Sequence, residues 1–229
     1  MKKIGIIGGM GPLATADLFT KIIKSSDATC DREHIPIIID NNTKIPDRTA
    51  AILGEGEDPL NEMSCSAKTL EKAGADFLVM SCNTAHYFYD ELIKEVKIPI
   101  LNMIEETAKY ILKKDPTVKK VGLLSTTGTT KGKVYESVFK KYNIEVISPN
   151  DEEKSEVMHL IYKVIKNWDS TYNPIKIKEI IKKMEKMGAE NIILGCTELP
   201  IAMEFFKIEG KFYDPTSILA LSAVERAKS

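Results

Sequence analysis

Two cysteines, Cys82 and Cys196, each follow the same short sequence pattern. The first copy, residues 71–84, reads EKAGADFLVMSCNT, and the second, residues 185–198, reads EKMGAENIILGCTE. Both contain Glu-Lys-x-Gly-Ala, then an apolar run, then the cysteine, and they align without a gap 114 residues apart. Free cysteine titrates near about 8.5, so a thiol can act as an acid or a base close to neutral pH. The pattern therefore predicts two comparable acid–base groups.

A pair of thiols on opposite faces of one carbon atom would form a two-base device. One thiolate would remove a proton, and the other thiol would deliver a proton to the opposite face, so the product would be the mirror image of the substrate. We expect a helix that starts after each cysteine to lower the thiol pKa, because its dipole stabilises the thiolate. A single nucleophilic cysteine usually needs a histidine partner, and His159 lies far from Cys196 in sequence.

Proton transfer by a side chain contributes only about 10²–10⁴-fold to a rate. The α-proton of an amino acid is a very weak acid, so further donors must stabilise the negative charge that develops. Suitable groups are the backbone N–H groups after each cysteine, together with Asn83, Thr84 and Thr197. His86 lies one helical turn after Cys82 and could polarise the thiol or support the site from behind; we favour the supporting role.

The elements that must position these groups repeat as well. Each copy predicts a helix that ends at a glycine, Gly74 or Gly188, and then a buried parallel strand that stops at the cysteine. A second repeat relates residues 2–15, KKIGIIGGMGPLAT, to residues 119–131, KKVGLLSTTGTTK. Two repeats in the same order indicate two similar α/β halves. The carboxyl ends of such strands are where open sheets bind ligands.

We expect two pseudo-symmetric, doubly wound α/β domains, each with a mainly parallel sheet, and an active site in the cleft between them. The predicted first domain is 1–100 plus 210–229, because the terminal helix is expected to return to the first half, and the second is 101–209. The predicted strands are 3–8, 35–40, 77–81, 98–101, 121–124, 144–147 and 192–194. The predicted helices are 14–25, 60–72, 85–94, 103–113, 134–142, 152–168, 175–187 and 215–227. The strand 35–40 is expected to be buried, 77–81 to be central, and 41–59 to be a long polar loop.

The loop after the first strand also fits a weaker pattern. Gly9-x-Gly11-x-x-Ala14 matches a dinucleotide fingerprint, with Asp40 at the end of the next strand. Pro12 argues against it, because proline lacks an N–H in the turn that would hold the pyrophosphate. We therefore favour a loop that holds a carboxylate.

Composition excludes several classes of partner. The net charge of −1, with 43% hydrophobic and 28% charged residues, is ordinary for a globular protein and predicts no nucleic-acid or membrane partner. No apolar run is long enough for a transmembrane helix, and the first residues do not resemble a signal peptide, so a cytoplasmic location is expected. The spacing of the four cysteines does not suit a metal site, and Cys30 and Cys65 are expected to be free thiols.

Three motifs in this order resemble the cofactor-independent aspartate/glutamate racemase superfamily. They are GGMGPLAT at 8–15, MSCNTAH at 80–86 and LGCTELP at 194–200. The Met-Gly-Pro loop, and Cys-Thr-Glu where glutamate racemases typically carry Cys-Thr-His, are similar to the aspartate racemase branch. The resemblance covers essentially the whole chain.

The resemblance implies two catalytic cysteines, Cys82 and Cys196, with neither pyridoxal phosphate nor metal, and a homodimeric enzyme. The arginine that binds a carboxylate in the family falls on Arg48, and the lysine of the second half falls on Lys166, with Lys163 as a near competitor. The other residues that the resemblance places in the substrate site are Met10, Asn83, Thr84, Thr126, Thr197 and Glu198.

The leading hypothesis is racemisation of a small amino acid, aspartate, with glutamate as a further substrate. Two alternatives remain open from the sequence. One is a maleate-type cis–trans isomerase that uses a covalent cysteine, because related enzymes run different reactions on the same scaffold. The other is a non-catalytic module that binds a nucleotide or an amino acid through the glycine-rich loop.

Overall fold

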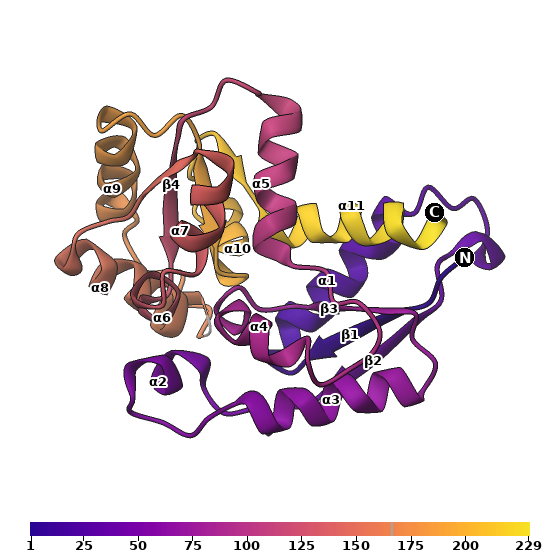
Figure 1. The fold of residues 1–229 in the computed structure, drawn as a ribbon. Coiled ribbons are helices and arrows are strands. Elements are labelled where there is room, and N and C mark those ends of the chain that lie inside the picture. The colour runs from indigo at the N-terminus through magenta and orange to yellow at the C-terminus, as the bar shows by residue number, and fades with distance from the viewer. Residues whose placement is uncertain (166) are drawn as a thin grey trace.

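The computed structural model describes residues 1–165 and 167–229 and contains two parallel sheets surrounded by helices (Figure 1). The first sheet has the order β2-β1-β3, and the second has the order β5-β4-β6-β7. Within each sheet the strands that pair are parallel. The α/β class with two similar halves is therefore confirmed.

The first sheet consists of β1 (Ile4–Gly8), β2 (Ile37–Asn41) and β3 (Phe77–Met80). Strands β1 and β3 are both completely buried, and β3 has a neighbour on each side, β1 and the bridged residue Ile100, so 77–81 is an inner strand of the sheet, as predicted. Strand β2 lies at the edge and is only partly buried, with Ile39 exposed, which contradicts the expected burial of 35–40. The predicted strand 98–101 is reduced to a single bridge between Leu78 and Ile100.

The second sheet repeats this arrangement and adds one short strand. Its members are β4 (Lys120–Ser125), β5 (Glu145–Ile147), β6 (Ile192–Gly195) and β7 (Phe212–Tyr213). Strand β4 lies between β5 and β6 as β1 lies between β2 and β3. Gly74 and Gly188, which precede β3 and β6, have φ of +86° and +97°, as the repeat predicted. Both cysteines consequently follow equivalent strands.

The helices fill the connections, and several of them differ from the prediction. The expected loop 41–59 contains a short helix, α2, and the expected helix 85–94 is divided into a 3₁₀ segment and the short helix α4. The expected helix 152–168 changes to a π-helix after His159, and α6 has no counterpart among the predicted helices. The first half contains α1 (Pro12–Ser25), η1 (Asp31–Glu33), α2 (Arg48–Leu53), α3 (Leu60–Lys72), η2 (Thr84–Phe88) and α4 (Tyr89–Leu92). The rest are α5 (Met103–Lys114), α6 (Thr127–Lys131), α7 (Val134–Phe139), η3 (Lys140–Tyr142), α8 (Asp151–His159), η4 (Leu160–Ile165), α9 (Ile175–Lys186), α10 (Glu198–Phe205) and α11 (Pro215–Lys228).

The last helix returns to the first half of the chain, as expected. In Figure 1 the yellow α11 lies against α1, near the N-terminus. Leu219 and Ala223 of α11 are completely buried in one apolar cluster with Ile4 and Leu18. Strand β7, in contrast, pairs with β6 in the second sheet. The domain boundary at residue 210 stays a prediction.

Candidate active site

One cavity collects the residues that the sequence singled out. It measures about 30 Å³. Nine of the ten predicted site residues line it: Met10, Arg48, Cys82, Asn83, Thr84, Thr126, Cys196, Thr197 and Glu198. The tenth, Lys166, lies outside the described residues, and its competitor Lys163 is exposed and not part of the lining.

Five lining residues have no counterpart among the predictions: Asp47, Thr49, Gly195, Ile161 and Tyr162. Asp47 caps α2, where its carboxylate accepts the Ala50 N–H at 2.8 Å. An aspartate at this position is a typical N-cap signal, and it could have revealed α2. Tyr162 reaches the cavity from η4, and burial raises its pKa to about 12. Nothing in the sequence of the predicted helix 152–168 distinguished Tyr162 as a residue that would line the cavity.

The thiol of Cys196 is hydrogen-bonded to a carboxylate. Cys196 directly follows β6, and its Sγ donates to Oε2 of Glu198 at 2.9 Å. The hydroxyl of Thr197 donates to the same oxygen at 2.9 Å. Burial, and then the negative charge of Glu198, raise the pKa of the Cys196 thiol well above its ordinary value. The expectation that the helix start lowers this pKa was therefore wrong for Cys196, because burial and Glu198 outweigh the helix dipole.

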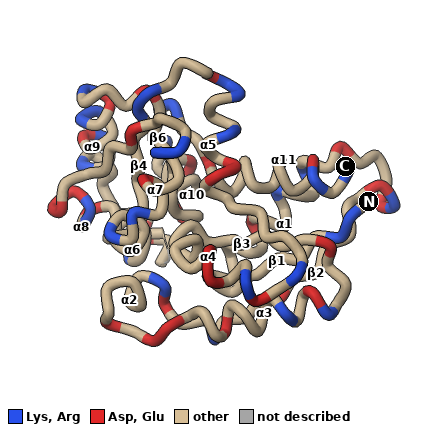
Figure 2. The backbone as a smooth tube through the Cα atoms, viewed as in Figure 1, with Lys and Arg blue, Asp and Glu red and all other residues tan. Residues whose placement is uncertain are grey.

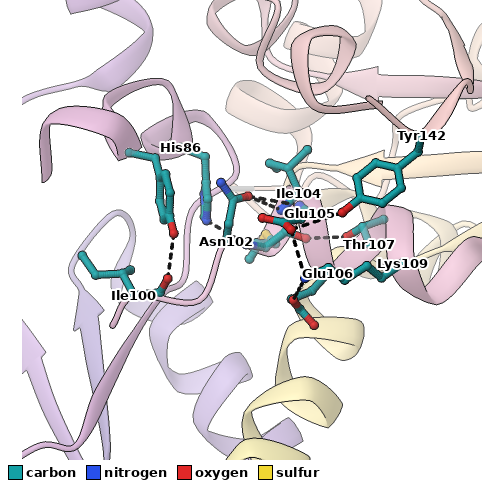
Figure 3. Close-up of polar contacts among 11 residues, drawn as sticks. His86, Ile100, Asn102, Ile104, Glu105, Glu106, Thr107, Lys109 and Tyr142 are labelled. Carbon is teal, nitrogen blue, oxygen red and sulfur yellow. Dashed lines mark hydrogen bonds and ion pairs between the residues drawn. The ribbon is translucent and has the colours of Figure 1, made fainter. Parts of the chain in front are cut away.

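Cys82 is held through its backbone by a buried histidine. The Nδ1 of His86 lies 2.9 Å from the Cys82 carbonyl oxygen, and its Nε2 accepts the Met103 N–H at 3.0 Å. Figure 3 shows His86 beside Asn102, which caps α5 through the N–H groups of Ile104 and Glu105. Burial lowers the pKa of His86 to about 4, so the neutral ring donates from Nδ1. His86 thus joins the strand end to the start of α5 and supports the site, as favoured from the sequence.

Arg48 brings a positive charge to the cavity without a carboxylate partner among the described residues. Its Nη atoms donate to the backbone carbonyls of Pro46 at 2.9 Å and Met10 at 3.2 Å. Its Nε is buried and has no hydrogen-bond partner in the described structure. A guanidinium group held in this way is suited to bind a carboxylate.

Three threonine hydroxyls connect the two halves at the cavity. Thr84 Oγ1 lies 3.0 Å from Thr126 Oγ1 and 2.9 Å from Thr129 Oγ1. The hydroxyls of Thr126 and Thr129 are 3.1 Å apart, which closes the triangle. Thr126 also caps α6 by accepting the Thr129 N–H. These hydroxyls can exchange their mutual hydrogen bonds for bonds to a polar ligand.

The glycine-rich loop uses its backbone groups within the protein. The N–H of Gly9 donates to Oγ1 of Thr15 at 3.0 Å, and α1 begins at Pro12. This N–H is therefore unavailable to a phosphate, which disfavours the nucleotide interpretation. The loop instead contributes Met10, which lines the cavity and whose carbonyl accepts from Arg48.

Comparisons with known proteins place this geometry in a family. Residues 7–223 match the family model described as Asp/Glu/hydantoin racemase. The chain belongs to this family. It is an amino-acid racemase, which confirms the enzyme class predicted from the sequence.

Relatives resemble the enzyme over its whole length. The broad specificity amino-acid racemase RacX of Bacillus subtilis (strain 168) is 27% identical in an alignment of 227 residues that covers 96% of each chain. The structure of Picrophilus torridus aspartate racemase superposes with a TM-score of 0.84 at 32% identity, over 100% of this chain and 95% of that one. An aspartate racemase homologue from Pyrococcus horikoshii OT3 gives 0.81 at 32% identity, over 100% of both.

Among the described residues, no group of three or more His, Cys, Asp or Glu side chains could hold a metal ion. None of the helices in that part of the chain combines the length and apolar character needed to cross a bilayer.

Proposed function

We propose that the enzyme interconverts L- and D-aspartate by proton transfer between Cys82 and Cys196, without pyridoxal phosphate. The observation that carries the proposal is that the two thiols, which follow equivalent strands of the two halves, line one cavity. Aspartate as the substrate is supported by the likeness to Picrophilus torridus aspartate racemase. The likeness to a broad specificity racemase makes glutamate the second substrate to test.

In the proposed mechanism, Cys196 begins as a thiol and Cys82 as a thiolate. The raised pKa of Cys196 supports this assignment. The Cys82 thiolate takes the α-proton, and the electron pair of the broken C–H bond moves into the carboxylate, which becomes enediolate-like. The Cys196 thiol then delivers its proton to the opposite face. One proton has left and one has arrived, so the enantiomer is released with the two thiols in exchanged states.

The remaining cavity groups act on the carboxylates of the substrate. Arg48 binds one carboxylate, and the hydroxyls of Thr84, Thr126 and Thr197 donate to the oxygens on which charge develops. In the proposal Lys166, assigned by the resemblance to the family, binds the second carboxylate. Two cations suit a dicarboxylate better than a neutral amino acid.

Incubation with L-aspartate in D₂O, without added cofactor, tests the proposed function. Chiral chromatography and mass analysis should give D-aspartate that carries one deuterium at Cα. A folded, reduced enzyme that forms no D-aspartate and exchanges no α-proton would exclude aspartate. Glutamate would then be tested in the same way.

The two-base mechanism predicts that each cysteine is required. Cys82→Ala or Cys196→Ala should each reduce racemisation by at least about 10³-fold, because one of the two proton transfers loses its group. The matched control is Cys65→Ala, at an exposed free thiol outside the cavity, which should keep its activity. A single active-site variant with nearly full activity would refute the mechanism.

We further propose a cytoplasmic homodimer that acts on a small amino acid and binds neither nucleic acid nor membrane. The backbone trace in Figure 2 shows the positions of basic and acidic residues interspersed along the chain, in agreement with a net charge of −1. Light scattering of the purified enzyme should give twice the mass of the chain. The mass of a single chain over a range of micromolar concentrations would contradict the dimer.

A further inference from the structure

The buried amide of Asn83 uses only half of its hydrogen-bonding groups. Asn83 is 2% exposed and lines the cavity. Its Oδ1 accepts the hydroxyl of Tyr135 at 2.5 Å, whereas its Nδ2 is buried without a partner in the described part of the chain. Burial of an amide N–H without an acceptor costs free energy. A buried donor of this kind at a cavity therefore indicates a ligand that accepts from it.

Tyr135 determines which way the amide points. Its side chain is completely buried, with its ring centroid 5.5 Å from that of Phe139. Burial raises the pKa of its hydroxyl well above the ordinary value, so the hydroxyl keeps its proton and needs an acceptor. If the amide were turned by 180°, the N–H groups of Nδ2 would face this O–H, and a buried donor would lose its acceptor. The favoured orientation therefore directs Oδ1 to Tyr135 and leaves Nδ2 as the donor.

The hydrogen bond joins the two halves of the molecule. Asn83 follows β3 in the first half, and Tyr135 belongs to α7 in the second. Asn83 also adjoins Cys82 in the sequence, so its amide and the catalytic thiol share one segment. A substrate carboxylate beside this thiol would meet either the Nδ2 donor or, after a flip, the Oδ1 acceptor. Only the donor stabilises a carboxylate that gains negative charge during reaction.

We propose that Tyr135 is a positioning residue that holds the Asn83 amide with Nδ2 toward the carboxylate of the substrate. The inference rests on the proposed function, because it assigns the group that Nδ2 meets. Tyr135 acts entirely through Asn83 and does not touch the substrate.

A double-mutant cycle tests this role. Asn83→Ala should lower kcat/KM about 10- to 100-fold, the usual effect of losing a hydrogen bond to a charged group. Tyr135→Phe, which keeps the ring and removes only the hydroxyl, should lower it about 5- to 20-fold. In the Asn83→Ala background the same tyrosine substitution should change kcat/KM by less than about twofold, because the residue through which it acts is already absent.

Two further variants complete the design. Asn83→Asp keeps an acceptor for Tyr135 but has no N–H, so its kcat/KM should fall as low as that of Asn83→Ala. Tyr172→Phe is the matched control, because Tyr172 also donates at 2.5 Å, to Glu156, and does not line the cavity. Its kcat/KM should stay within about twofold of the wild type. Thermal unfolding of every variant is measured as the control that the variant is folded.

Three results would overturn the inference: no effect of Tyr135→Phe in the wild type, the same fold-loss in kcat/KM in both backgrounds, or an active Asn83→Asp variant.

A wild type that racemises no amino acid would refute the proposed function alone. The orientation of the Asn83 amide can then be determined without an activity measurement, from the NMR signals of its side-chain ¹H–¹⁵N groups. These signals are identified by their absence from the spectrum of Asn83→Ala. Tyr135→Phe should shift and broaden these signals, and unchanged signals would refute the positioning role.

Discussion

At the scale of single residues, the environment of Cys196 decides in which form this thiol begins the reaction. A thiolate there would lie in a buried site beside the carboxylate of Glu198, so the protonated thiol is favoured. The same environment makes the Cys196 thiolate a strong base once it has formed, which suits the reverse reaction. One pair of side chains therefore serves both directions of the proposed racemisation.

Replacement of Glu198 should change the pH dependence of the reaction. Glu198→Gln removes the negative charge that disfavours the Cys196 thiolate, so the pKa of Cys196 falls. The alkaline limb of kcat/KM, in the direction where Cys196 donates its proton, should move to lower pH by about one unit. The pH profile of racemisation of each enantiomer measures this. Glu204→Gln, at an exposed position of the same helix α10, is the control, and an unmoved limb in Glu198→Gln would contradict the argument.

His86 should link the stability of the protein to pH. Its pKa is about 4 in the folded protein and about 6.5 when exposed, so the unfolded chain takes up a proton first as the pH falls. His86 therefore contributes its full stability above about pH 6.5, and this contribution of about 3 kcal/mol is lost as the pH falls through about 4. His86→Gln should be less stable than the wild type at pH 7, and the difference should shrink toward pH 4.

Urea unfolding at several pH values measures the His86 contribution. His159→Gln, at an exposed histidine, should follow the wild type over the same range. A constant difference between His86→Gln and the wild type from pH 7 to pH 4 would show that the titration of His86 does not contribute.

At the scale of elements, the loop after β1 must pass very close to the segment after β2. Gly9 has φ of +89°, and a Cβ there would overlap the Asn42 backbone, whereas a Cβ at Gly11 would meet no atom within 4 Å. Gly9→Ala should therefore destabilise the protein by about 1–3 kcal/mol and displace Met10, with a loss of racemase activity. Gly11→Ala is the control, and both should be compared by urea unfolding and racemisation. Equal stabilities of the two variants would contradict this account.

The repeated strand ends were predictable because their signals are local. An apolar run between Gly74 or Gly188 and a cysteine specifies a buried strand by composition alone, and it placed both thiols correctly. Helix α2 was missed because six residues are too few to show a helical period. The exposure of Ile39 could not be read from its segment, since an apolar strand at a sheet edge has the same sequence pattern as a central one.

Most of the residues that line the candidate site could be predicted from the sequence, but the pKa of the Cys196 thiol could not. The two cysteines belong to repeated motifs, whereas Arg48 and Thr126 were assigned through the resemblance to the family, and all four line one cavity. The raised pKa of Cys196 depends on the depth of burial and on where Glu198 points. Both follow from packing across the two halves, which no local pattern encodes.

At the scale of the whole molecule, contacts between the two halves close the cavity. Helix α2 of the first half packs against α6 of the second, with Thr49 at the contact. Thr49 also lines the cavity, and the first residue of α2 is Arg48. The proposed carboxylate-binding group therefore lies on an element whose position is set by the opposite half.

A single added methyl group should separate these two elements. A Cβ on Gly128 would lie 2.7 Å from Thr49 Oγ1 and 2.8 Å from Thr49 Cα, so backbone must move and α2 must shift away from α6. Gly128→Ala should raise KM for aspartate about tenfold with a smaller change in kcat, because Arg48 is displaced while both thiols stay on their strand ends. Steady-state kinetics test this against Lys131→Ala, an exposed change on α6. A fall in kcat at constant KM would mean instead that closure of the two halves governs the proton transfers, and that Arg48 is held independently of α6.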